Sequence, residues 1–161
     1  MPIANRDFFL HAYHLKHLKR EGWCRVGIEN PESVASHSWG LALLVLLLAP
    51  PHLHKERMLE LALIHDLPEV IVGDITPHDN ISKEEKKRME RIAANQILPS
   101  QFLDIWMEYE ENQTAEAQFV HVLDKLDMAL QAILYQHQAD TEEFILSAKN
   151  KIPKALWEQF F

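Results

Sequence analysis

The sequence predicts an all-α protein that folds as one compact helical bundle. Three observations support this prediction: the chain has only four glycines, no segment alternates polar and apolar residues as a strand would, and helix-capping residues precede several apolar segments. A length of 161 residues matches a single domain, and 47% hydrophobic residues can fill a substantial core. We therefore expect one domain over residues 1–161.

The first part of the chain predicts three helices. Asn5 can cap a helix that runs to about residue 20. The stretch EGWCRVGIENPE follows, and its two glycines and one proline are typical of a loop. Ser33 can cap a second helix, which stops at Pro50 and Pro51. A third helix is expected over about 54–67, before another proline.

The second part begins with a connector, EVIVGDITPHDN, for which we expect no helix. Ser82 with Glu85 fits a capping box for a charged, solvent-facing helix. Further helical segments are expected at about 100–110, from 140 onward, and in the closing KALWEQFF. The segment 114–139 is apolar around much of its circumference, which predicts a central, buried helix.

Charge and composition exclude several classes of function. A net charge of −8 disfavours binding to nucleic acids or anionic membranes, because both are polyanions. The apolar run LALLVLLLAPP is too short to span a membrane. Cys24 is the single cysteine and cannot form an internal disulfide, so we expect a cytoplasmic protein.

Four residues predict a metal site: His37, the adjacent pair His65 and Asp66, and Asp124. Both aspartates interrupt strongly apolar helical segments, where an ionised carboxylate is usually paired or bound to a metal. Neighbouring side chains on a helix diverge by about 100°, but the helix end expected at Pro68 would let both members of the pair reach one ion.

Two imidazoles and two carboxylates suit one divalent ion such as Mn, Fe, Co, Ni or Mg, and Zn is retained as a further option. This ligand set leaves positions for water, whose pKa a metal lowers, so hydrolysis is the leading hypothesis. Taken alone, His65 fits a core histidine and His37 fits a residue of a helical first turn. The joint pattern favours the metal site.

Three segments make a family resemblance explicit. ESVASHSW, ALIHDLPEVIVGDITP and LDKLDMALQA resemble the signature of the HD-domain metal-dependent phosphohydrolases, and most closely the 5′-deoxynucleotidase branch. The match spans about 22–135. It implies the all-α HD bundle, with His37, His65, Asp66 and Asp124 as metal ligands. It also implies that the related enzymes' catalytic and substrate-orienting roles fall to Glu69 and Asp74.

The substrate's phosphate requires positive charge. Arg25 stands in the expected loop before the His37 helix and could reach the metal cleft, while Trp23 could stack on a base. A solvated arginine and a core tryptophan are the alternative interpretations. The bacterial deoxynucleotidase pattern has an arginine directly before this tryptophan, where Gly22 stands here. Arg20 could substitute, and selectivity for deoxyribose is less certain than hydrolysis itself.

The sequence thus predicts a metal-dependent hydrolase that removes the 5′-phosphate from (deoxy)nucleoside monophosphates. Hydrolysis of another phosphoester or signalling nucleotide, and a catalytically silent nucleotide-binding protein, are the alternatives. The resemblance also implies a homodimer. Asp127, three residues after Asp124, could orient a ligand, and His78 and His121 are weaker candidates for a second metal.

Overall fold

Short polar side chains begin several helices, as the sequence predicts. In the computed structural model, which describes residues 5–161, Asn5 Oδ1 accepts the Phe8 N–H at 3.0 Å and starts α1 (Arg6–Tyr13). Ser33 Oγ accepts the Ser36 N–H and starts α3 (Val34–Leu48). Ser82 caps α6 (Lys83–Ile97) in the same way. The Glu85 carboxylate pairs with Arg88, so only one half of the predicted capping box is present.

The helix predicted to reach residue 20 ends earlier. After α1 the chain forms a 3-10 turn, η1 (His14–Lys16), which buries Leu15. The backbone then leaves the helical path because its N–H and C=O groups bond to a distant segment: the Arg20 N–H donates to the Glu32 carbonyl, and the Val34 N–H to the Leu18 carbonyl. An isolated antiparallel bridge between Lys19 and Ser33 belongs to the same contact.

Two short helices occupy segments for which we expected none. They are α2 (Glu21–Arg25), in the expected loop, and α5 (Glu69–Val72), in the expected connector. Gly73 ends α5 with a φ of 81°, a conformation that favours glycine, and the chain turns there toward Asp74.

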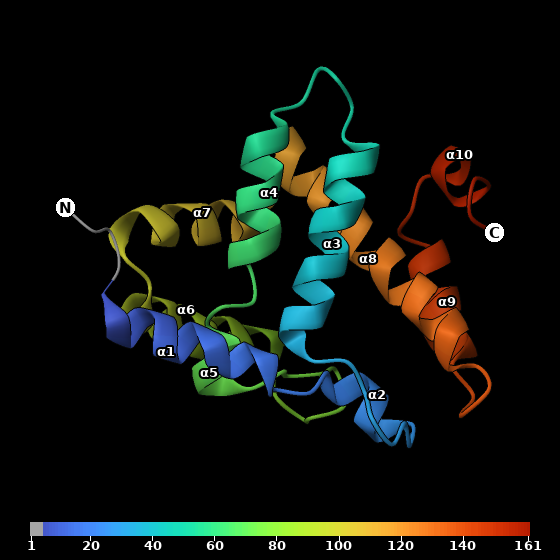
Figure 1. Ribbon diagram of the computed structural model, residues 1–161, viewed down its shortest axis with the longest axis horizontal. Helices are drawn as coiled ribbons and strands as arrows, with labels where there is room; N and C mark the ends of the chain where they lie inside the picture. Colours follow the sequence, from blue (N-terminus) through green and yellow to red (C-terminus); the bar gives the residue numbers. More distant parts are fainter. Residues whose placement is uncertain (1–4) are drawn as a thin grey trace.

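The remaining helices match their predicted places. They are α4 (Lys55–Ile64), α7 (Ser100–Glu111), α8 (Ala115–Tyr135), α9 (Glu142–Lys149) and α10 (Lys154–Trp157). Helix α8 crosses behind α3 and α4 and contacts both, and α9 returns along its C-terminal half (Figure 1).

The main core lies where α3, α4 and α8 meet. Leu41, Val45, Leu61, Val120 and Leu123 are inaccessible to solvent there. The all-α prediction is confirmed, and the predicted central position of α8 agrees with its contacts. Among residues 5–161, no helix combines the length and the apolar character needed to cross a bilayer.

Candidate metal centre

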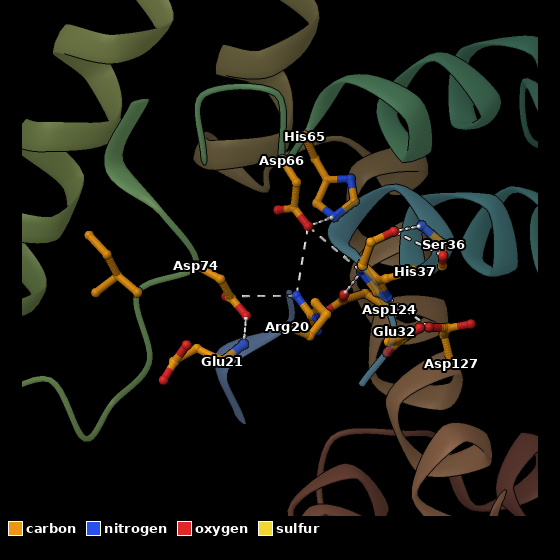
Figure 2. A network of polar contacts seen from close by, with 12 residues as sticks. Arg20, Glu21, Glu32, Ser36, His37, His65, Asp66, Asp74, Asp124 and Asp127 are labelled. Atoms are coloured by element: carbon orange, nitrogen blue, oxygen red, sulfur yellow. Dashed lines mark hydrogen bonds and ion pairs between the residues drawn. The ribbon is translucent and has the colours of Figure 1, made fainter. Parts of the chain in front are cut away.

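The four predicted ligands converge although they come from separate elements (Figure 2). His37 lies in the first turn of α3 and is fully buried. His65 caps the C-terminus of α4, with Asp66 in the turn that follows, and Asp124 lies in the middle of α8. Because α3, α4 and α8 pack against one another, the ligands meet inside the bundle.

The distances suit a shared cation. Nε2 of His37 lies 3.0 Å from Oδ1 of Asp124 and 3.8 Å from Oδ2 of Asp66. Nε2 of His65 lies 3.1 Å from Oδ2 of Asp66. His37, His65 and Asp124 each offer one ligand atom, and these three atoms all lie within 4.8 Å of one another.

Buried polar atoms without partners point to the same ion. Within the described chain, Nε2 of His37, Nε2 of His65 and Oδ2 of Asp66 are buried and have no hydrogen-bond partner. Leaving such groups unpaired costs about 1–3 kcal/mol each. One divalent cation would satisfy all three, so the donor set fits a metal ion.

The second ring nitrogen of each histidine is already engaged. Nδ1 of His65 contacts the Ala62 carbonyl oxygen at 2.9 Å, so this nitrogen is the donor and Nε2 is free to bind an ion. Nδ1 of His37 contacts Oδ2 of Asp127 at 2.7 Å. Both imidazoles therefore direct Nε2 toward the same point.

The charges of the cluster favour a protonated His37 and an ionised Asp124. Burial and the charge of Arg20 oppose protonation of His37, but the adjacent carboxylates of Asp124 and Asp127 outweigh them and raise its pKa to about 9. Burial also opposes ionisation of Asp124. The neighbouring Lys125 and His37 overcome it and hold the pKa of this carboxyl well below its usual value.

Glu69 is a buried carboxyl beside the ligand cluster. It is the first residue of α5, and its side-chain atom Oε2 is buried without a hydrogen-bond partner in residues 5–161. Burial, followed by repulsion from Asp66 and Asp74, raises the pKa of Glu69 well above its ordinary value. A carboxyl group with a raised pKa binds a proton more strongly than an ordinary glutamate, which suits a proton-transfer group.

Asp74 follows Gly73 and joins two segments. Its Oδ2 accepts the Glu21 N–H at 2.7 Å, at the start of α2. Its Oδ1 lies 3.9 Å from Nη1 of Arg20, and that same nitrogen lies 3.8 Å from Asp66 (Figure 2). Arg20 thus lies between Asp74 and the ligand Asp66.

Arg20 is the charged residue to which sequence reasoning gave too little weight. It precedes α2, and its guanidinium lies between Asp66 and Asp74. Burial opposes its charge, yet the surrounding carboxylates raise its pKa further above the usual range. The signal in the sequence was its position three residues before Trp23, in the segment where the related enzymes carry an arginine.

Arg25 and Trp23 lie at the wall of the cavity rather than among the ligands. Arg25 forms an ion pair with Glu143 on α9. Trp23 is 2% exposed, donates its indole N–H to Glu32 at 2.9 Å, and packs on Phe144. Both residues line the cavity, but Trp23 has little free surface. Their substrate contacts stay predictions.

The weaker candidates are dispersed. His121 accompanies Asp124 on α8, but its Nε2 contacts the Tyr109 carbonyl oxygen at 2.9 Å and its ring stacks on that tyrosine. His78 lies in the exposed loop after Asp74. Both line the cavity, and neither belongs to the cluster of His37, His65 and Asp124.

The cluster opens into a cavity of about 540 Å³, a volume typical of small-molecule sites. Its lining includes seven cationic side chains: Arg20, Arg25, Lys83, Lys86, Lys87, Lys125 and Lys151. It also includes seven acidic ones: Asp66, Glu69, Asp74, Glu90, Glu110, Asp124 and Glu143. The cations provide contacts for an anionic ligand although the chain as a whole is acidic.

Known proteins resemble this chain over most of its length. The model of the family described as HD domain matches residues 12–160. A 5′-deoxynucleotidase of Schizosaccharomyces pombe is 41% identical over 80% of this chain and 71% of its own length. A 5′-deoxynucleotidase of Xenopus laevis is 46% identical over 76% of this chain. The chain spans 64% of that frog protein, slightly under two thirds.

Solved structures agree in fold. A conserved hypothetical protein from Pyrococcus furiosus is 34% identical, with a TM-score of 0.82 over 96% of this chain and 95% of its own. A protein from Magnetospirillum magnetotacticum, described as a predicted metal-dependent phosphohydrolase, is 31% identical. Its TM-score is 0.66 over 78% of this chain and 69% of its own.

Proposed function

Because the chain belongs to the HD domain family, we propose that it is a metal-dependent phosphohydrolase that removes the 5′-phosphate from deoxyribonucleoside monophosphates. The observation that carries the proposal is the convergence of unpaired buried atoms from His37, His65 and Asp66 beside Asp124. The names of the related 5′-deoxynucleotidases direct the choice of substrate.

We assign His37, His65, Asp66 and Asp124 as the ligands of one divalent ion, with Mn, Co, Mg, Fe, Ni and Zn as candidates. An ion held there would supply positive charge to a phosphate oxygen and lower the pKa of the attacking water. The Nδ1 atoms of His65 and His37 contact Ala62 and Asp127, which orients both rings with Nε2 toward the proposed ion.

Glu69 is assigned as the proton-transfer group. It accepts a proton as water attacks phosphorus, and returns one to the departing 5′-oxygen of the nucleoside. Its burial and raised pKa support this role, since an ionised carboxylate with a raised pKa is a stronger base than an ordinary glutamate. Asp74 holds Arg20 in place and orients the substrate.

Arg20 is assigned as the main phosphate contact. It lies beside Asp66 in the lining of the cavity, and a guanidinium can contact two phosphate oxygens at once. Charge building up on the transferred group would be stabilised there. Arg25 is assigned to the nucleoside side and Trp23 to the packed wall that supports it, because both line the cavity farther along α2 and Trp23 is buried.

Phosphate release from a panel of ribo- and deoxyribonucleoside 5′-monophosphates with Mn²⁺, Co²⁺ or Mg²⁺ tests the proposal. We expect turnover that a chelator abolishes and that Asp66→Ala reduces by at least about a thousandfold. His137→Ala, at an exposed histidine outside the cavity, is the matched control. Absence of turnover on every monophosphate would overturn the proposal.

We also propose a cytoplasmic homodimer that binds neither nucleic acid nor membrane. The single cysteine supports a cytoplasmic location. The net charge of −8 supports the absence of binding to nucleic acid or membrane. One face of α3 exposes Trp39, Leu43, Leu46 and Leu47, and Leu47 is 73% exposed. Sedimentation of the wild type and of Leu47→Glu tests whether this face joins two copies.

A further inference from the structure

We propose that Asp127 is a positioning residue for the metal ligand His37, and that position 40 is a glycine because this carboxylate needs the space. The inference rests on the proposed metal-dependent function. It concerns two residues outside the set of four ligands, on α8 and α3. Its readouts do not require substrate.

The contact between His37 and Asp127 fixes which nitrogen carries the proton. Nδ1 of His37 lies 2.7 Å from Oδ2 of Asp127. An ionised carboxylate can only accept, so Nδ1 donates to Asp127. The imidazole is fully buried, and its Nε2 lies among the candidate ligands, 3.0 Å from Oδ1 of Asp124 and 3.8 Å from Oδ2 of Asp66. With Nδ1 held as a donor by Asp127, Nε2 is the nitrogen that an ion can bind.

A second carboxylate strengthens this preference. Glu32 reaches the same side of the imidazole: one atom each from Glu32, His37 and Asp127 falls within a group whose members are all within 4.8 Å of one another. Oε1 of Glu32 is held there by the Trp23 indole N–H at 2.9 Å. Nε2 also faces two carboxylates, those of Asp124 and Asp66. A cation bound among these groups would leave the ring proton on Nδ1, where Asp127 and Glu32 stabilise it.

The spacing along α8 makes one helix responsible for both contacts. Asp124 and Asp127 are three residues apart and lie on the same face of the helix. Asp124 faces Nε2 of His37 and Asp127 faces Nδ1 (Figure 2). The ring is thus fixed at both nitrogens by a single rigid element.

Gly40 provides the space that the Asp127 side chain occupies. A methyl group at position 40 would overlap Oδ1 of Asp127. Glycine inside a helix normally destabilises the helix relative to alanine, and Gly40 lies in the middle of α3. The cost is explained if the carboxylate must pack directly against the α3 backbone.

The experiment is a double-mutant cycle with metal-free protein. Binding of Mn²⁺ is measured by calorimetry for the wild type, Asp127→Ala, Gly40→Ala and the double variant. We expect Asp127→Ala to weaken Mn²⁺ binding about 10- to 100-fold. Gly40→Ala should weaken it similarly in the wild type and have no further effect in the Asp127→Ala background. Asp127→Asn retains an acceptor and should lose less.

Asp104→Ala, at an exposed aspartate on α7, is the matched control and should bind Mn²⁺ like the wild type. Nitrogen-15 spectra of the metal-free wild type, recorded at a pH high enough for the His37 ring to be neutral, report the tautomer directly, and we expect the remaining proton on Nδ1. If Asp127→Ala does not fold, this spectrum and the Asp127→Asn affinity decide the question.

Four results would overturn the inference: unchanged Mn²⁺ affinity in a folded Asp127→Ala protein, equal losses from Gly40→Ala with and without Asp127, a neutral His37 ring with its proton on Nε2, or a second ion bound at Glu32 and Asp127. None of them depends on turnover. A protein that binds Mn²⁺ but hydrolyses no monophosphate would refute the proposed function and leave this inference standing.

Discussion

Nε2 of His65 lies 3.1 Å from Oδ2 of Asp66, although the two residues are neighbours in the chain. The geometry is possible because α4 ends at Ile64 and the backbone continues as turns through Pro68. A continuous helix would point the two side chains about 100° apart. The pair can therefore offer one nitrogen and one oxygen to the same ion.

Metal binding should depend steeply on pH. The pKa of His37 is raised from 6.5 to about 9, so its proton stabilises the metal-free fold below pH 6.5, and this stabilisation is lost as pH rises through 9. An incoming ion must displace the proton. We expect Mn²⁺ affinity to rise about tenfold per pH unit between pH 7 and 9 and to level off above. Calorimetry across this range measures the slope, and a flat profile would contradict the assignment of His37.

Glu69→Gln should remove activity and stabilise the metal-free protein. The pKa of Glu69 is raised above 4.5, so the folded state binds more protons than the unfolded state, and stability falls as pH rises above 4.5. Glutamine has no such cost. We expect a higher Tm than the wild type at pH 7.5, no difference near pH 4, and phosphate release lowered by about 10²- to 10⁴-fold. A lower Tm at pH 7.5 would show that the Glu69 carboxylate stabilises the fold.

Arg20→Ala should lower kcat/KM by about 10²- to 10³-fold, because it removes the cation assigned to the transferred phosphate. Arg20→Lys should recover only part of the loss, since an ammonium lacks the two-pronged geometry of a guanidinium. Arg25→Ala, at the Glu143 ion pair, should change kcat/KM only several-fold. Arg88→Ala, on the exposed surface of α6, is the control. A larger fall in kcat/KM for Arg25→Ala than for Arg20→Ala would instead assign the phosphate contact to Arg25.

Trp23→Phe should reduce stability more than substrate binding. Phenylalanine leaves Glu32 without its indole donor and leaves space beside Phe144. We expect a loss of about 1–3 kcal/mol in the free energy of unfolding and little change in KM. Denaturant unfolding and steady-state kinetics measure the two effects. A large rise in KM with unchanged stability would indicate that the ring contacts the nucleobase.

Features that depend on local contacts could be predicted from the sequence. The caps at Asn5, Ser33 and Ser82 each bond to an N–H three residues away, so the local sequence is sufficient. The candidate ligands were predictable because charges inside apolar helices require partners. Their mutual distances needed the fold, since His37 and Asp124 lie on different helices.

Features that depend on distant contacts could not be predicted. The early end of the first helix results from backbone bonds between Arg20 and Glu32 and between Leu18 and Val34. That contact also brings Arg20 into the site. For Trp23 the residue type fits a core position as well as a binding surface, and only the burial of its ring distinguishes them.

The amide of Glu21 donates to Oδ2 of Asp74, 53 positions farther along the chain, while the other oxygen of that carboxylate faces Arg20. The exchange of the Glu21 amide hydrogen with deuterated solvent therefore reports how often the segments that carry Glu21 and Asp74 separate beside the cavity. A substrate that holds them together would slow its exchange, and one main-chain proton would thus record occupancy without any chemical label.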